Sequence, residues 1–176
     1  MSAEPNGNVA RLHRVGRAIL GAGRGIANIV YGTVVAIATL SAAYPGERDP
    51  WKLEVLVAST VFAVWIAHLY AHTLAESIEH NRRLTREGLF AIARRELGIL
   101  FAAAPPIVAL TLGTIGLVSE HTAVWLAISI GLVTLAAQGV RYARIERLSR
   151  KGTLVAVAGN FALGLFVVLL KQFVVH

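Results

Sequence analysis

The chain has 176 residues, of which 56% are hydrophobic and only 15% are charged, and its mean hydropathy is +0.63. A soluble domain of this size carries more charge, and a chain without cysteine has no disulfides, thiolate metal ligands or cysteine nucleophiles. The net charge of +7 comes from short basic segments between apolar blocks and forms no basic face with interleaved aromatic residues, which excludes a nucleic-acid partner. The composition predicts an all-α, polytopic integral membrane protein whose main partner is the lipid bilayer.

Five apolar blocks are each about as long as the roughly 20 residues that a helix needs to cross a membrane. A polar, basic leader, 1–24, precedes them, and a helical segment, 76–95, is expected to continue from the second block. The remainder, 25–176, is predicted to form one transmembrane domain. The predicted membrane-spanning helices cover about 25–44, 52–75, 96–118, 123–140 and 152–170.

Arginine and lysine are concentrated in three segments: the leader, 76–95 and the linker 141–151. In a protein with five spans these segments all lie on the same side, which predicts a cytoplasmic N-terminus and an external C-terminus. Their basic side chains also suit anionic lipid headgroups. The preference for arginine over lysine, with abundant alanine, glycine and valine, is typical of GC-rich bacterial genomes. It indicates a multi-pass protein of a bacterial inner (plasma) membrane.

Titratable side chains recur at four-residue steps in "AHLYAHTLAESIEH", 67–80, which contains His68, His72, Glu76 and His80. Each four-residue step rotates the side chain by about 40° and advances it by about 6 Å along a helix. Four members therefore extend over about 18 Å, so one ion cannot contact them all. His68, His72 and Glu76 share one stripe, and His68 lies about 22 Å along a membrane core of about 30 Å.

Two imidazoles at positions i and i+4 can bind one divalent metal ion, with further ligands from another segment or from a partner subunit. His68, His72 and Glu76 are the predicted metal or proton site, and Glu96, at the mouth of the third span, is a supporting candidate ligand. Two alternatives remain open at this stage. The stripe is a proton relay, because imidazole exchanges protons near neutral pH, or its histidines are interfacial side chains wetted by headgroups.

Two adjacent prolines, Pro105 and Pro106, lie in the middle of the third predicted span. Proline removes a backbone donor and clashes with the preceding turn, so a kink or an opening of this helix is expected. Such a break either shapes the helix bundle or exposes backbone carbonyls to an ion, as broken helices do in transporters.

The layout resembles that of the vacuolar iron transporter family. Three stretches are similar to it: "IVYGTVVAIATLSAA" at 29–43, "AAAPPIV" at 102–108 and "RIERLSRKGTLVAVAGNFALGLFVV" at 144–168. The resemblance implies five spans, a cytoplasmic N-terminus, an external C-terminus and a cytoplasmic helical extension between the second and third spans.

The chain departs from that family at its ion ligands. Tyr31 stands where the family has an acidic residue before a glycine, the sole methionine is Met1, and the acidic residues of 76–95 that precede Glu96 are few (Glu76, Glu79 and Glu87). The resemblance therefore implies that the histidine stripe substitutes for the family's ion path.

Two functions are consistent with the sequence. The first is a small transporter, expected to be a homodimer, that moves a divalent metal cation or protons through the second span, with the metal as substrate and no resident cofactor. The second is a non-transporting accessory or scaffold protein whose basic loops bind lipid or a partner; a membrane sensor driven by histidine protonation is a third, weaker option. The sequence has neither a Walker pattern nor G-x-S-x-G, and no enzymatic activity is expected.

Overall fold

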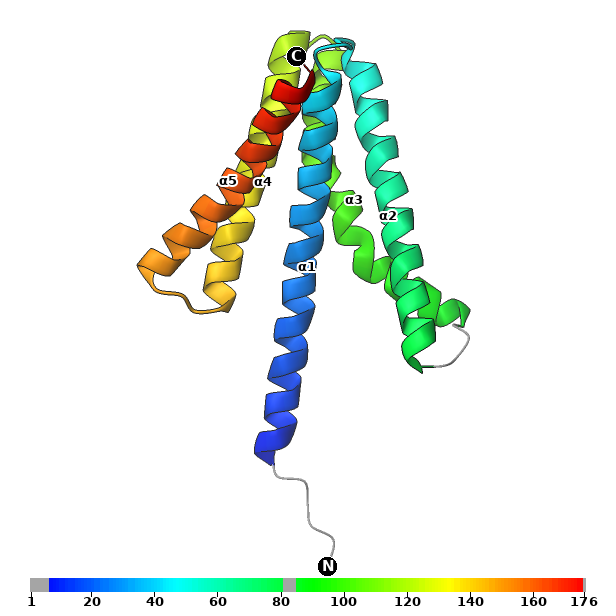
Figure 1. Cartoon of the computed structure of the whole chain (residues 1–176), viewed down its shortest axis with the longest axis vertical. Coiled ribbons are helices and arrows are strands. Elements are labelled where there is room, and N and C mark those ends of the chain that lie inside the picture. The colour runs from blue at the N-terminus through cyan, green and yellow to red at the C-terminus, as the bar shows by residue number, and fades with distance from the viewer. Residues whose placement is uncertain (1–6, 81–84, 176) are drawn as a thin grey trace, which may run out of the picture.

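The computed structural model describes residues 7–80 and 85–175, and these residues form five α-helices and no strand. The helices converge near the connections 44–49 and 115–119, and the α2–α3 and α4–α5 hairpins diverge from each other toward the opposite end, on either side of α1 (Figure 1). Their bounds are α1 Gly7–Ala43, α2 Pro50–His80, α3 Arg86–Thr114, α4 Glu120–Ile145 and α5 Arg150–Val175.

All five helices are long and apolar enough to cross a membrane, which confirms the predicted all-α architecture with five candidate spans. α1 is the central helix: it contacts each of the other four, and 44% of its candidate span is buried, compared with 11% in α5. The apolar surface that remains exposed on α2 and α5 is expected in a protein whose solvent is lipid.

The polar flanks of the predicted spans are helical in the structure. The leader from Gly7 onward belongs to α1, and the basic linker is helical as far as Ile145. The segment 76–95 is not one extension: α2 ends at His80, and α3 begins at Arg86 after the N-cap residue Thr85, whose hydroxyl accepts the N–H of Gly88. Residues 1–6 of the leader and the predicted cytoplasmic Arg82 and Arg83 lie outside the described residues.

α3 runs as one α-helix through Pro105 and Pro106, although both lack the N–H that would bond to the carbonyls of Phe101 and Ala102. The expected opening of the helix therefore does not occur. Pro106 is fully buried in the bundle, and it acts here as a packing residue.

α1 and α3 approach each other closely at Gly32. A Cβ atom at this position would collide with the carbonyl oxygen of Ile99 and with the Cβ of Ala102. Gly32→Ala is therefore expected to lower the free energy of unfolding by more than about 2 kcal/mol, because backbone cannot move aside as a flexible side chain can. Thermal unfolding in detergent measures the loss. Gly25→Ala on the same helix is the control, since nothing lies within 4 Å of its added Cβ, and an equal loss in both variants would contradict the close approach.

The turn after α4 places Arg147 in the left-handed backbone region, with φ of 51°. The N–H of Leu148 bonds back to the carbonyl of Ala143, as in a helix C-terminus that normally ends in glycine. Because glycine has no Cβ to clash in this region, Arg147→Gly is expected to raise the free energy of unfolding by about 0.5–1 kcal/mol. Arg144→Gly, one residue before the end of α4, is expected to lower it in the same unfolding assay, since glycine weakens a helix.

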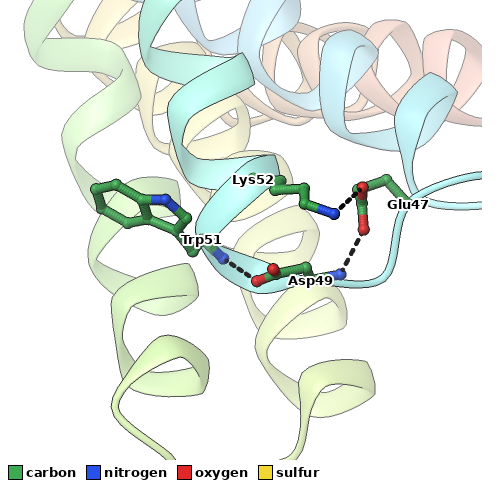
Figure 2. Close-up of polar contacts among 4 residues, drawn as sticks. All are labelled: Glu47, Asp49, Trp51 and Lys52. Atoms are coloured by element: carbon green, nitrogen blue, oxygen red, sulfur yellow. Dashed lines mark hydrogen bonds and ion pairs between the residues drawn. The ribbon is translucent and has the colours of Figure 1, made fainter.

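The connection between α1 and α2 is held by its own polar contacts (Figure 2). Lys52 Nζ lies 3.0 Å from Glu47 Oε2, the N–H of Asp49 donates to Glu47 Oε1, and the N–H of Trp51 donates to Asp49 Oδ1. The Asp49 N–H and the Lys52 ammonium lower the pKa of Glu47 below its ordinary value of 4.5. A lowered folded pKa gives stability that is complete at neutral pH and is lost only as the pH falls below that ordinary value.

Candidate functional site

Three titratable side chains from α2 and α3 form one group: His68, His72 and Glu96. Glu96 Oε2 lies 3.8 Å from Nε2 of His68, and Glu96 Oε1 lies 4.0 Å from Nε2 of His72. One ligand atom from each residue lies within 4.8 Å of the others. The two imidazoles share a helix face because they are four residues apart, and α3 brings the carboxylate to that face from a neighbouring helix.

Glu96 is the buried member of the group, with only 3% of its side chain exposed. Its Oε2 atom is buried and has no hydrogen-bond partner among the described residues. A buried carboxylate oxygen without a partner is unfavourable unless a cation or a proton satisfies it. Glu96 therefore has an environment that a bound cation, a proton or a protonated histidine would satisfy.

Contacts between α1 and α3 fix the position of Glu96. The side-chain amide of Asn28 donates a hydrogen bond of 3.2 Å to the carbonyl of Arg95, the residue before Glu96. Gly98, two residues after Glu96, lies against Asn28, and a Cβ there would come within 3.1 Å of the asparagine Cβ. The backbone on both sides of Glu96 is thus held by one buried residue of α1.

The histidines form the open side of the site. Their side chains are 35% and 49% exposed, and their ring centroids lie 4.9 Å apart. The ring of Tyr31, on α1, lies 5.5 Å from that of His68. The site thus combines one buried carboxylate with two exposed imidazoles. Three protein ligands leave coordination positions on a metal ion for water.

The donor set fits a divalent transition metal. Imidazole nitrogen and carboxylate oxygen are the ligands of Zn²⁺ and its neighbours, and tetrahedral ligands at about 2.1 Å from the ion are about 3.4 Å apart. The separations of 3.8 and 4.0 Å reach two different oxygens of Glu96, and ligand atoms taken one from each residue lie within 4.8 Å of one another, so the site is wider than this. Rotations of the exposed imidazoles would narrow it, so the ion would draw the three side chains together.

The structure brings together only part of the predicted site. Glu76, the predicted carboxylate, is exposed on α2 outside this three-residue group, and Glu96, a supporting candidate, occupies the place beside the histidines. Tyr31 is in ring contact with the site. Pro105 and Pro106 are nine and ten residues beyond Glu96, or about 14 Å along α3, so they lie outside the three-residue group. The side chain of His80 lies outside the described residues.

Fold and site together define a class: a five-helix, multi-pass membrane protein with a candidate metal site between its second and third helices. Comparisons of the chain with models of protein families, with curated proteins and with solved structures find no match.

Proposed function

We propose that the protein is a small membrane transporter for a divalent transition-metal cation, which binds at His68, His72 and Glu96. One observation carries this proposal: a buried carboxylate oxygen without a hydrogen-bond partner, with two accessible imidazole nitrogens about 4 Å from that carboxylate. An ionisable residue within a membrane-spanning helix is a functional candidate by default, because its burial is unfavourable without a purpose.

The geometry suggests how an ion would be captured. The exposed imidazoles would exchange the first water molecules of the hydrated cation, and Glu96 would then supply the negative charge that offsets the lost hydration. Because the carboxylate is already buried and fixed through Asn28, it would pull the ion away from the surface and into the bundle. Three protein ligands leave the ion incompletely coordinated, and this keeps binding weak enough for release.

We also propose how the protein is oriented and in which membrane it lies. With the basic segments on the cytoplasmic side of a bacterial inner membrane, the site would lie on the cytoplasmic half of α2, with the N-terminus inside and the C-terminus outside. The transporter would act as a homodimer, since five helices enclose little space for a path. The basic segments would hold anionic lipid headgroups at the same surface.

Uptake of divalent metals into liposomes containing the purified full-length chain tests the proposal. We expect saturable uptake of one or more of Mn²⁺, Fe²⁺, Co²⁺ and Zn²⁺, and no uptake of Mg²⁺ or Ca²⁺, which prefer sites made only of oxygen. Liposomes without protein are the control. Proton movement without any metal uptake would replace the metal by a proton, and the absence of both would favour a scaffold.

A further inference from the structure

Two hydroxyl groups on the central helix differ from three others in the bundle. Thr39, Thr73 and Thr134 donate to the backbone carbonyl four residues earlier, at 2.7–2.8 Å, which is how a membrane helix usually satisfies a hydroxyl. Thr33 and Ser41, both on α1, do not: Thr33 Oγ1 and Ser41 Oγ are buried and have no partner among the described residues, and both residues are 0% exposed.

Other buried polar atoms without partners lie on helices that contact α1. They are Nε1 of Trp65 on α2, Oε2 of Glu96 on α3 and Oε1 of Gln138 on α4. Such atoms are rare in folded proteins, because each loses its hydration without replacement, and in hydrocarbon the loss is larger. The hydroxyls of Thr33 and Ser41 need a partner that the described side chains do not supply, and water is the usual partner of such groups in protein interiors.

Contacts between the helices place these atoms in order along α1. The contact of Tyr31 with His68 aligns α1 with the antiparallel α2, so Thr33 lies about 3 Å and Trp65 about 4.5 Å deeper than this contact. Thr33 faces α4, since a Cβ on Gly131 would lie 3.7 Å from its methyl group. Gln138 is on the same face of α4, but it lies seven residues or about 10 Å from Gly131 in the direction away from Ser41, because α4 runs antiparallel to α1. Ser41 lies about 12 Å beyond Thr33 along α1.

We propose that the unpaired hydroxyls of Thr33 and Ser41 mark a hydrated route along the buried face of α1. In this route the cation leaves Glu96, passes Thr33 and reaches the opposite membrane surface near Ser41. Water molecules held by the two hydroxyls replace part of the hydration shell that the ion loses. The identity of the ion rests on the proposed function, whereas the hydrated route does not. Side chains of the fully buried Ile37 and Leu40 lie between the two hydroxyls, so passage requires the helices at the convergent end to separate.

Thr33→Val is the first test, because it removes the hydroxyl and keeps the shape of the side chain. In liposomes we expect metal uptake to fall at least tenfold, while the metal affinity of the purified protein stays within twofold of wild type. Ser41→Ala is expected to act in the same way. Thr39→Val is the matched control on the same helix, since its hydroxyl is already bonded to the carbonyl of Val35, and its uptake should equal that of wild type. Equal uptake in the Thr33 and Thr39 variants would overturn the route.

A second test does not depend on transport. The chain contains no cysteine, so a single Thr33→Cys thiol can be followed alone. We expect it to react with 2-aminoethyl methanethiosulfonate at least ten times faster than the thiol of Ala36→Cys, because this reagent attacks a thiolate, which forms only where water reaches. Ala36 is buried at 1% exposure on the same helix, and its neighbourhood is apolar.

The two tests separate the two ideas. Fast reaction at position 33 in a protein that moves no metal would support the hydrated route and contradict the proposed metal transport. Metal uptake with equally slow reaction at positions 33 and 36 would keep the transport function and overturn the route.

Discussion

Glu96→Gln is expected to lower the affinity of the purified protein for a divalent metal at least a hundredfold without lowering its stability in the absence of metal. Glutamine keeps the shape of the side chain and one carbonyl oxygen but not the charge that binds a cation. In the metal-free protein, Glu96 Oε2 is buried without a hydrogen-bond partner, so the carboxylate opposes folding. A neutral amide relieves this penalty, and we expect a melting temperature equal to or above that of wild type.

Calorimetric titration with Mn²⁺, Co²⁺ or Zn²⁺ measures the affinity, and thermal unfolding in the same detergent measures the stability. Glu76→Gln is the matched control: Glu76 lies one turn beyond His72 on α2 but outside the three-residue group, so its affinity should stay within twofold of wild type. A structural ion pair between Glu96 and the histidines makes the opposite prediction, namely lower stability and no change in metal binding. That result would contradict the proposed metal site.

The five helices could be predicted because membrane helices are specified locally. Each apolar block is long enough to cross hydrocarbon, and within hydrocarbon the backbone must satisfy itself as a helix. The boundary between α2 and α3 was harder to place. Residues 76–84 contain neither glycine nor proline, and the start of α3 depends on the cap at Thr85, with Glu87 in the first turn, signals that are easily missed within a polar stretch.

The two histidines of the site could also be predicted from local helix geometry, whereas the position of the carboxylate could not. The i, i+4 spacing of His68 and His72 follows from the geometry of one helix, and the same spacing pointed to Glu76 as the carboxylate. The carboxylate beside the histidines is instead 24 residues after His72 in the chain, and the antiparallel packing of α2 and α3 places it there. In the sequence, Glu96 directly follows Arg94 and Arg95, so it looks like one more charged residue at the membrane interface. Its burial follows from the packing of Asn28 and Gly98, which no local pattern reveals.

The double variant His68→Ala/His72→Ala is expected to abolish saturable metal uptake, with a residual rate less than a tenth of that of wild type. Without the imidazoles only the Glu96 carboxylate remains, and one carboxylate is too little to replace the hydration of a divalent ion. The single variants should differ. His68→Ala is expected to have the larger effect, because His68 is the less exposed histidine and contacts both Tyr31 and the ring of His72.

His121→Ala is the control for removing a histidine that lies outside the site. His121 lies on α4 outside the site, and its Nε2 accepts a hydrogen bond of 3.0 Å from the indole N–H of Trp125. Uptake by this variant should equal that of wild type. Combining Glu96→Gln with the double histidine variant should add nothing further, because groups that bind one ion lose their effect together. A double variant that still transports metal at the wild-type rate would show that the ion crosses elsewhere, and a further loss on adding Glu96→Gln would show that Glu96 acts without the histidines.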